Sequence, residues 1–339
     1  MRTLTLNNGL TIPVIGFGTY KAKLDSLTQA LNEGYKYLDT ASYYGNERDI
    51  STALEQTGIK REEVFIASKI WRSDMGYDGT MKSFSRTLEN LGTDYLDVLM
   101  IHWPRPNLEL REWKALDLET WRAMENLHSK GKIRALGLSN FLPHHSENIL
   151  AHCRVRPSIA QLEFHAGHTQ AFALEYYRRE GIQVQAWSPI GRGRVLADEL
   201  IVELAGKYHV TPAQVCIRFC IQEGVMPLPK ASTPERLREN LECLDFEIDD
   251  EDISRIENMP PVGWSGEHPD RERVKMVLPE AEKPFPHYNL LEQKAGFVDA
   301  GFEILQADEV AKEMIAPGGP SYDRLVALLG RGILREDGS

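Results

Sequence analysis

The sequence predicts an α/β fold: a (β/α)8 TIM barrel with an N-terminal β-hairpin plug and a long C-terminal extension. Short apolar, β-branched runs alternate with longer amphipathic runs, and eight such pairs span about 240 residues. That number and that length match a barrel of this kind. Apolar runs flanked by helices are also typical of buried parallel strands. A third observation is that polar residues follow the ends of most of these strands.

The eight units follow one another without a break. In chain order, each predicted strand and its helix are 14–18 with 26–34, 35–40 with 48–58, 64–70 with 80–92, 94–102 with 118–131, 133–140 with 144–153, 158–164 with 170–181, 184–189 with 196–208 and 211–224, and 225–230 with 233–241. The seventh strand is thus followed by two helical patterns. This alternation is the βα repeat that a parallel sheet requires.

A small hairpin precedes the first unit. Residues 3–13 are TLTLNNGLTIP, and Asn8-Gly9 is a strong signal for a tight hairpin turn. We expect this hairpin to plug one end of the barrel. An open doubly wound sheet is the structural alternative, but it usually places GxGxxG after its first strand. Here GFGTYK at 16–21 offers only GxG.

The pattern changes after about residue 260. We expect the barrel to occupy residues 1–272 and a C-terminal extension to occupy 273–339. The extension has helix-like segments at 289–305 and 321–334. It could pack on the barrel, form a lid over the site, or make a dimer contact.

Charge and composition exclude several partners. The net charge of −11 argues against nucleic acid or an anionic membrane as a non-specific partner. No apolar run approaches the roughly 20 residues of a membrane span, and the N-terminus lacks the apolar core of a signal peptide. The four cysteines show no CxxC pair or metal-like spacing. We therefore expect a cytoplasmic monomer or homodimer without a metal, acting on a small molecule.

Polar residues at successive strand ends carry the candidate chemistry. Asp39 ends the second strand, Lys69 lies in the third, and Tyr44 lies in the loop between them. A tyrosine hydroxyl has a pKa near 10, which a nearby ammonium would lower. A carboxylate would hold that ammonium charged. His102, at the next strand end, could donate a hydrogen bond to a carbonyl oxygen.

Each of these residues also has an ordinary structural interpretation. Tyr44 could pack in the core, Asp39 could cap a helix, and Lys69 could be a solvated charge. His102 could be a satisfied core histidine. The four together at consecutive strand ends favour a site, because the C-terminal ends of barrel strands meet at one rim where active sites are built.

Five motifs resemble the aldo-keto reductase family over about residues 3–270. They are YLDTASYYGNE, ASKIW, YLDVLMIHWP, GLSNF and PLPKASTPERLRENL, in that order. The resemblance implies reduction of an aldehyde or ketone with NADPH. Tyr44 would be the general acid, Lys69 and Asp39 would tune it, and His102 would orient the carbonyl group. The reaction would be reversible.

The resemblance also implies where the cofactor binds. The expected contacts are Gly18, Thr19, Ser139, Asn140, Gln161, Trp187, Ser188, Ile190, Lys230, Ser232, Arg236, Glu239 and Asn240. Trp187 offers a face for stacking the nicotinamide ring. Lys230 and Arg236 suit the 2′-phosphate of NADPH. The family's usual serine after the clamp lysine is Ala231 here, which makes NADH possible as well.

Aromatic residues should form the substrate pocket. Tyr20, Trp71, Trp103 and Phe141 match the family's pocket positions, and such walls suit a carbonyl compound with an apolar portion. Two other functions remain open. One is a redox-sensing or regulatory subunit that binds nucleotide and turns over weakly. The other is a barrel with metal-dependent chemistry, which the absence of a carboxylate-and-histidine cluster at the predicted strand ends disfavours.

Overall fold

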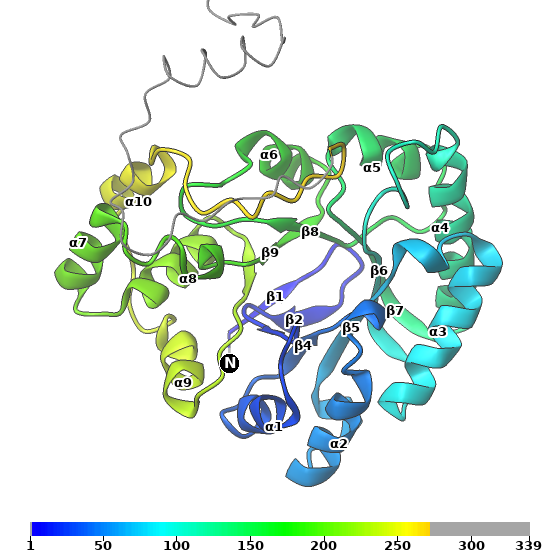
Figure 1. The fold of residues 1–339 in the computed structure, drawn as a ribbon, viewed down its shortest axis with the longest axis horizontal. Coiled ribbons are helices and arrows are strands. Elements are labelled where there is room, and N and C mark those ends of the chain that lie inside the picture. The colour runs from blue at the N-terminus through cyan, green and yellow to red at the C-terminus, as the bar shows by residue number, and fades with distance from the viewer. Residues whose placement is uncertain (1, 272–339) are drawn as a thin grey trace, which may run out of the picture. The chain divides into compact units, whose positions relative to one another are not determined.

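The computed structural model describes residues 2–271, and these form the expected barrel (Figure 1). Its parallel strands lie side by side in chain order: β3 (Phe17–Gly18), β4 (Tyr37–Asp39), β5 (Phe65–Ile70), β6 (Leu96–Ile101), β7 (Ile133–Ser139), β8 (Ile159–Glu163), β9 (Gln183–Trp187) and β10 (Met226–Leu228). All eight predicted strands are present, which confirms the (β/α)8 prediction.

Backbone hydrogen bonds close the barrel between its first and last strands. The amides of Gly16 and Gly18 donate to the carbonyl oxygens of Pro227 and Pro229, both at 3.0 Å. A Cβ on Gly18 would lie 2.8 Å from the carbonyl oxygen of Leu228. The GxG sequence therefore serves this close strand approach, because any side chain at Gly18 would push β3 and β10 apart.

Helices surround the strands on the outside. They are α1 (Leu24–Asn32), α2 (Glu47–Thr57), α3 (Tyr77–Leu91), α4 (Trp113–Ser129), α5 (Pro143–Leu150), α6 (Ala171–Arg179), α7 (Glu199–Tyr208), α8 (Pro212–Gln222), α9 (Pro234–Glu242) and α10 (Asp250–Glu257). Helix α10 was not predicted from the sequence. Acidic residues fill its first turn, where they favour helix formation through the helix dipole.

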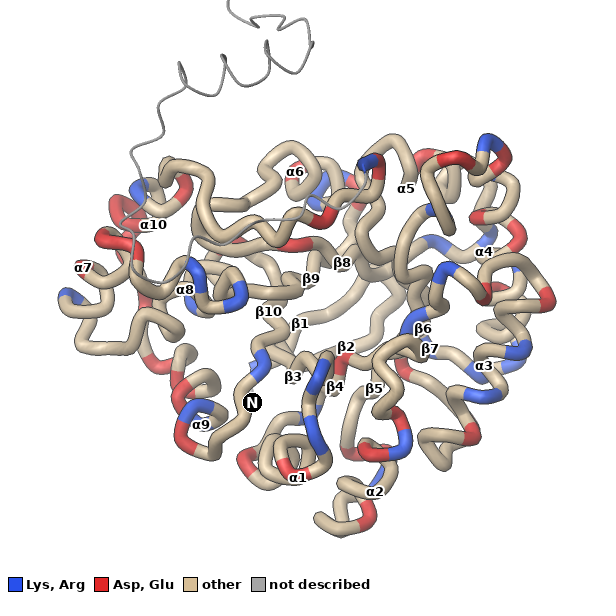
Figure 2. Tube along the Cα trace, in the orientation of Figure 1, with Lys and Arg blue, Asp and Glu red and all other residues tan. Residues whose placement is uncertain are grey.

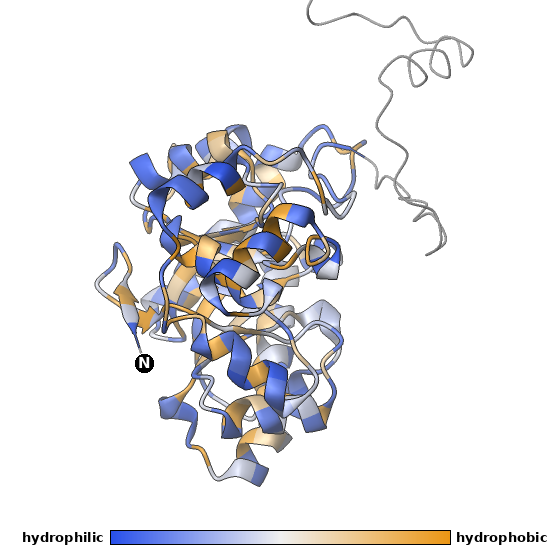
Figure 3. Cartoon of the chain, turned by 90° about the vertical axis from the view of Figure 1, so that its left-hand side faces the viewer, coloured by the Kyte–Doolittle hydropathy of each residue, from blue (hydrophilic) through white to orange (hydrophobic). Residues whose placement is uncertain are grey.

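The N-terminal hairpin closes the amino-terminal end of the barrel (Figure 3). Its strands are β1 (Thr3–Thr5) and β2 (Thr11–Pro13), which pair antiparallel. Leu6 and Ile12 pack with interior barrel residues such as Met100. The Asn7 side chain donates to the carbonyl oxygen of Pro157, just before β8. The opposite, carboxyl-terminal end of the strands is left for the site.

Charged residues lie mainly on the outer helices and loops (Figure 2). No helix in residues 2–271 is long and apolar enough to cross a membrane. The proposed extension, residues 273–339, lies outside the described residues, so its boundary and its role stay predictions.

Candidate active site

Backbone strain concentrates at the carboxyl-terminal rim of the barrel. Positive φ angles occur at six non-glycine residues of the described chain, and five of them lie in loops that follow strands: Lys21, Asn140, Gln170, Ser188 and Arg192. Such conformations cost roughly 1–3 kcal/mol each and cluster at functional sites. The strained loops therefore indicate that a functional site lies at this rim.

A buried ion pair lies at the centre of this rim. The Nζ atom of Lys69 lies 2.7 Å from Oδ2 of Asp39 and 2.9 Å from the carbonyl oxygen of Thr40. Gln161 donates from Nε2 to Oδ1 of Asp39 at 2.8 Å. Both carboxylate oxygens are thus engaged, which compensates the cost of burying these charges. Burial lowers the pKa of Lys69, and Asp39 opposes that effect.

Tyr44 completes the hydrogen bonding of this ammonium. It ends a short 3-10 helix, Ser42–Tyr44, and its hydroxyl oxygen lies 3.5 Å from Nζ of Lys69. The three donors of Lys69 therefore have three acceptors. The ring of Tyr44 lies 5.0 Å from that of Tyr20 and 5.7 Å from that of His102, between centroids.

The acidity of Tyr44 differs from the sequence expectation. Its pKa is raised well above the ordinary value, first by burial and then by the negative charge of Asp39, whereas we expected Lys69 to lower it. The ammonium of Lys69 is paired with Asp39 at 2.7 Å, so its charge does not outweigh the effect of burial on the pKa of this hydroxyl. The hydroxyl therefore stays protonated across the neutral range, which is the form a proton donor needs.

His102 follows β6 and is held in a dry environment. It is 7 % exposed, and its Nδ1 atom is buried without a hydrogen-bond partner in residues 2–271. Burial lowers its pKa well below the ordinary value, and the charges of Lys69 and Arg72 act in the same direction. The imidazole is therefore neutral near pH 7. A buried polar atom without a partner suggests a place where a bound molecule is needed.

Asn140 and Trp187 form one unit with the backbone of His102. The Nδ2 atom of Asn140 donates to the carbonyl oxygen of His102 at 2.9 Å and to Oγ of Ser139 at 3.2 Å. Its Oδ1 accepts a hydrogen bond from Nε1 of Trp187 at 2.8 Å. Both amide protons of Asn140 are used within the protein, so a nicotinamide carboxamide would have to approach the free lone pair on Oδ1.

Other expected cofactor contacts already make interactions within the protein. Gln161 donates to Asp39 and also to Gln185 at 3.1 Å, which leaves its own Oε1 without a partner among the described residues. The hydroxyl of Thr19 is occupied by the carbonyl oxygen of Asp39 at 3.0 Å. Ile190 packs against the apolar core, so the site would use the backbone of this loop near Ser188.

The expected phosphate clamp lies at the start of α9. Lys230, Ser232 and Arg236 are exposed, Glu239 is half-buried and Asn240 is buried. The side chains of Lys230 and Arg236 make no hydrogen bond or ion pair with residues 2–271. Ala231 is buried with its methyl group in the core. Two cations are thus available for an anion, whereas residue 231 offers no hydroxyl.

Aromatic side chains surround the mouth beside His102. Trp71 lies 5.0 Å from the His102 ring, and Tyr43 stacks on Trp71 at 3.8 Å, between centroids. Tyr20 is half exposed. Phe141 is fully buried in the core, and like Tyr20 and Trp71 it lines neither described cavity, so its part in a substrate pocket stays a prediction. Sequence reasoning missed Tyr43, although its place beside Tyr44 was a usable signal.

A cavity of about 200 Å³ opens next to these rings. Trp103, Asn140, Leu162, Glu163 and Trp187 line it from the barrel, and Trp264, Glu267, His268, Pro269 and Arg271 line it from the last described segment. We call residues 262–271 the strap. The contribution of Trp264 was not predicted, because nothing in the local sequence around it indicates which part of the barrel it covers.

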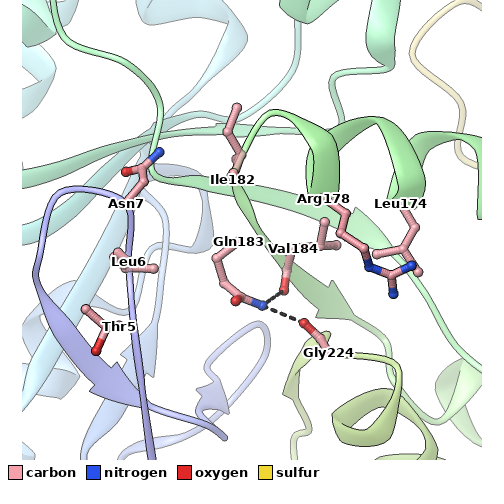
Figure 4. A pocket seen from close by; sticks show the side chains of 10 residues that line it. Thr5, Leu6, Asn7, Leu174, Arg178, Ile182, Gln183, Val184 and Gly224 are labelled. Atoms are coloured by element: carbon pink, nitrogen blue, oxygen red, sulfur yellow. Dashed lines mark hydrogen bonds between the residues drawn. The ribbon is translucent and has the colours of Figure 1, made fainter.

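A second cavity, of about 190 Å³, lies at the other end of the barrel beside the hairpin (Figure 4). Two side-chain amides line it, and both are engaged: Gln183 donates to the carbonyl oxygens of Val184 and Gly224 at 2.9 and 2.8 Å, and Asn7 donates to that of Pro157 at 2.9 Å. The residues proposed for catalysis line neither cavity. The first cavity is nevertheless the one that shares residues with the candidate site, because Asn140 lines it and also donates to the carbonyl oxygen of His102.

Comparison with known families agrees with this geometry. The model of the aldo/keto reductase family matches residues 15–260, which include Asp39, Tyr44, Lys69 and His102. The chain belongs to the aldo/keto reductase family. Its members are oxidoreductases that use nicotinamide cofactors, and carbonyl reduction is the reaction class that this membership supports.

Individual aldo/keto reductases are similar along most of their length. Glyoxal reductase of Bacillus subtilis is 38% identical over 273 residues, covering 79% of this chain and 96% of that protein. A crystal structure of an aldo/keto reductase from Brucella melitensis has a TM-score of 0.71 and 36% identity, covering 75% of this chain and 98% of the other. An aldo-keto reductase complexed with NADPH has a TM-score of 0.72 and 30% identity, covering 78% and 88%.

Proposed function

We propose that this protein reduces an aldehyde or ketone to an alcohol with NADPH, and that Tyr44 is the general acid. The observation that carries the proposal is the arrangement around Lys69, whose ammonium lies 2.7 Å from Asp39 and 3.5 Å from the Tyr44 hydroxyl. This arrangement stands at the strand-end rim beside His102. It supplies a protonated donor and a positioned cation in one dry place.

Tyr44 would give its proton to the carbonyl oxygen as negative charge develops there. The bound nicotinamide supplies the hydride for the carbonyl carbon. Lys69, at 3.5 Å, would stabilise the phenolate that remains on Tyr44. Asp39 would keep Lys69 charged and fixed during this transfer. In the reverse direction, the same phenolate would accept the proton of the alcohol, so the reaction is reversible.

His102 would orient the carbonyl group. Its low pKa keeps it neutral, because burial and two nearby cations disfavour the imidazolium. A neutral imidazole can donate one hydrogen bond without competing for the proton that Tyr44 delivers. Its rigid support comes from Asn140, which binds the His102 carbonyl oxygen at 2.9 Å. The substrate would thus receive two hydrogen bonds at one oxygen.

The residues at the rim fit a nicotinamide dinucleotide. Trp187 would stack on the nicotinamide ring, and its indole is fixed by Asn140 at 2.8 Å. Ser139 and Oε1 of Gln161 would bind the carboxamide. The backbone near Gly18 and Ser188 would pass close to the pyrophosphate. Glu239 and Asn240 would contact the adenine end.

NADPH is the favoured cofactor because two exposed cations, Lys230 and Arg236, stand free for a 2′-phosphate. Arg236 can bind phosphate through two parallel hydrogen bonds. Ser232 offers one hydroxyl nearby, but Ala231 offers none. NADH therefore remains possible at lower affinity.

An initial-rate panel of aldehydes, ketones and keto acids with each cofactor tests the proposal. We expect turnover with NADPH, weaker turnover with NADH, and loss of this preference in Lys230→Ala. The variant should lose about 1.5–3 kcal/mol of NADPH binding, the range for a hydrogen bond to a charged group. Cofactor binding without any turnover would contradict the enzyme function and support a nucleotide-binding regulatory subunit.

A further inference from the structure

Arg72 stands beside His102 at the mouth of the site. It begins the short 3-10 helix Arg72–Asp74 directly after β5. Its guanidinium carbon lies 4.5 Å from the ring centre of Trp103 and 5.8 Å from that of Trp71. Trp103 lines the 200 Å³ cavity, and Trp71 lies 5.0 Å from the His102 ring. The cation is thus held between two aromatic walls of the substrate entrance.

The guanidinium of Arg72 has no acceptor in the described chain. Its Nε atom is buried without a hydrogen-bond partner, and residues 2–271 offer its side chain no hydrogen bond or ion pair. Arg61 also has a buried Nε without a partner, but its terminal nitrogen lies 2.8 Å from Asp97, and Arg194 donates to the carbonyl oxygen of Trp264 at 2.6 Å. Arg72 therefore keeps a binding capacity that its surroundings do not use.

The charges around Arg72 bear on what it can bind. Burial lowers the pKa of Arg72; the negative charge of Glu267 opposes this effect, and the positive charge of Arg105 adds to it. A half-dry guanidinium gains most from an acceptor that uses both of its parallel N–H groups, and a carboxylate has that geometry. Two acidic residues, Glu163 and Glu267, and one cation, Arg271, also line the cavity, so a single negative charge on the ligand fits better than a dianion.

We propose that Arg72 binds a carboxylate carried by the substrate, so that the preferred substrates are aldehyde or keto acids with one negative charge. This inference rests on the reductase function proposed above and narrows it to a substrate class. The aromatic rings of Trp71 and Trp103 would cover the apolar part between the carbonyl group and the carboxylate. His102 and Tyr44 would hold the carbonyl end.

The competing interpretation is that Arg72 only stabilises the mouth by stacking between the tryptophans. Cation–π contacts of this kind contribute about 0.5–2 kcal/mol. If Arg72 has only this structural role, replacing it would change KM for charged and neutral substrates by the same factor. The two interpretations therefore predict different ratios of KM for an acid and its neutral ester when Arg72 is replaced.

The test measures kcat and KM for 4-carboxybenzaldehyde and for its methyl ester, with saturating NADPH. Arg72→Gln removes the charge, Arg72→Lys keeps the charge without the planar fork, and Lys82→Gln removes an exposed cation from α3 as the matched control. We expect Arg72→Gln to raise KM for the acid about 10- to 100-fold, the equivalent of one charged hydrogen bond. KM for the ester should change less than about twofold, and Arg72→Lys should be intermediate.

Equal changes for the acid and the ester in Arg72→Gln would overturn the inference, and so would an unchanged KM for both. Either result leaves the reductase function standing, because the wild-type protein still turns over both aldehydes. If the wild-type protein reduces neither aldehyde while binding NADPH, the proposed function itself fails. A thermal unfolding curve of each variant establishes that the compared proteins are folded.

Discussion

Buried carboxylates of this protein differ in whether their oxygens have hydrogen-bond partners. Asp39 has a partner on each oxygen, at 2.7 and 2.8 Å, and serves the site. Asp117, on α4, is fully buried, and neither of its oxygens has a hydrogen-bond partner in residues 2–271. Burial raises its pKa to about 9. The same residue type therefore has opposite consequences at two positions.

The raised pKa of Asp117 makes the stability of the fold depend on pH. The folded chain keeps the proton up to about pH 9, whereas the unfolded chain loses it near its ordinary pKa of about 3.9. Between these values the unfolded state binds fewer protons, so stability falls as pH rises. The effect is absent below about pH 4, where both states are protonated.

Asp117→Asn should therefore stabilise the protein more at pH 8 than at pH 5, by a difference of about 1–3 kcal/mol. Thermal unfolding of the variant and the wild type at both pH values measures this. Asp94→Asn, at an exposed acid, is the control and should shift both curves equally. A gain that is the same at both pH values would show that Asp117 is already ionised in the folded state.

At the scale of elements, the strap is held to several loops at once. Ser265 donates from its amide and its hydroxyl to the buried carboxylate of Glu163 at 2.8 and 2.6 Å. Arg194 donates to the carbonyl oxygens of Gly263 and Trp264. Asp270 pairs with Arg105, and also with His145 at 3.0 Å. These contacts join the loops after β6 and β9, the helix α5 and the end of β8 around the cavity.

Asp270→Asn should loosen the strap without damaging the catalytic residues. Because the strap lines the cavity but contributes none of the four proposed catalytic residues, we expect KM for the substrate to rise about 3- to 10-fold, since losing one ion pair costs about 1 kcal/mol. The value of kcat should change less than twofold. Steady-state kinetics of Asp270→Asn and of a control variant, Asp249→Asn, measure this. Asp249 is an exposed carboxylate that pairs with Lys207. A fall in kcat with KM unchanged would instead place Asp270 in the chemical step.

The pattern of apolar and amphipathic runs predicted the strands and helices of the barrel well. It predicted the directions of individual side chains less well. The eight strands follow from alternating apolar and amphipathic runs, and the positions of Asp39, Lys69 and His102 follow from strand ends. Asn140 and Phe141 show the limit. Asn140 has a left-handed backbone, at φ 62°, and the next residue, Phe141, is fully buried in the core. No local pattern indicates that turn.

Contacts between distant segments were also beyond sequence reasoning. Gln161 was expected to bind the cofactor, and that stays a prediction for its Oε1; the sequence did not indicate that its amide protons hold Asp39 and Gln185. The pKa of Tyr44 was expected to fall, but burial raises it. Both outcomes depend on which side chains the closed barrel brings together and on how much water it excludes.

At the scale of the whole molecule, stability and chemistry occupy opposite ends of the barrel. The hairpin and the interior cluster around Ile12 and Met100 fill the amino-terminal end. The ion pair, the strained loops and the 200 Å³ cavity lie at the carboxyl-terminal end. This division is general in such barrels. If the proposed mechanism holds, a change at Tyr44 should remove the reaction while the fold and cofactor binding persist.

The most direct test of the account is a single-turnover measurement on Tyr44→Phe with NADPH already bound. A positioned general acid contributes about 100- to 10,000-fold, so the hydride-transfer rate should fall by that factor while the Kd for NADPH changes less than about twofold. A transfer rate close to that of the wild type would mean that another group delivers the proton, and the mechanism proposed here would be wrong.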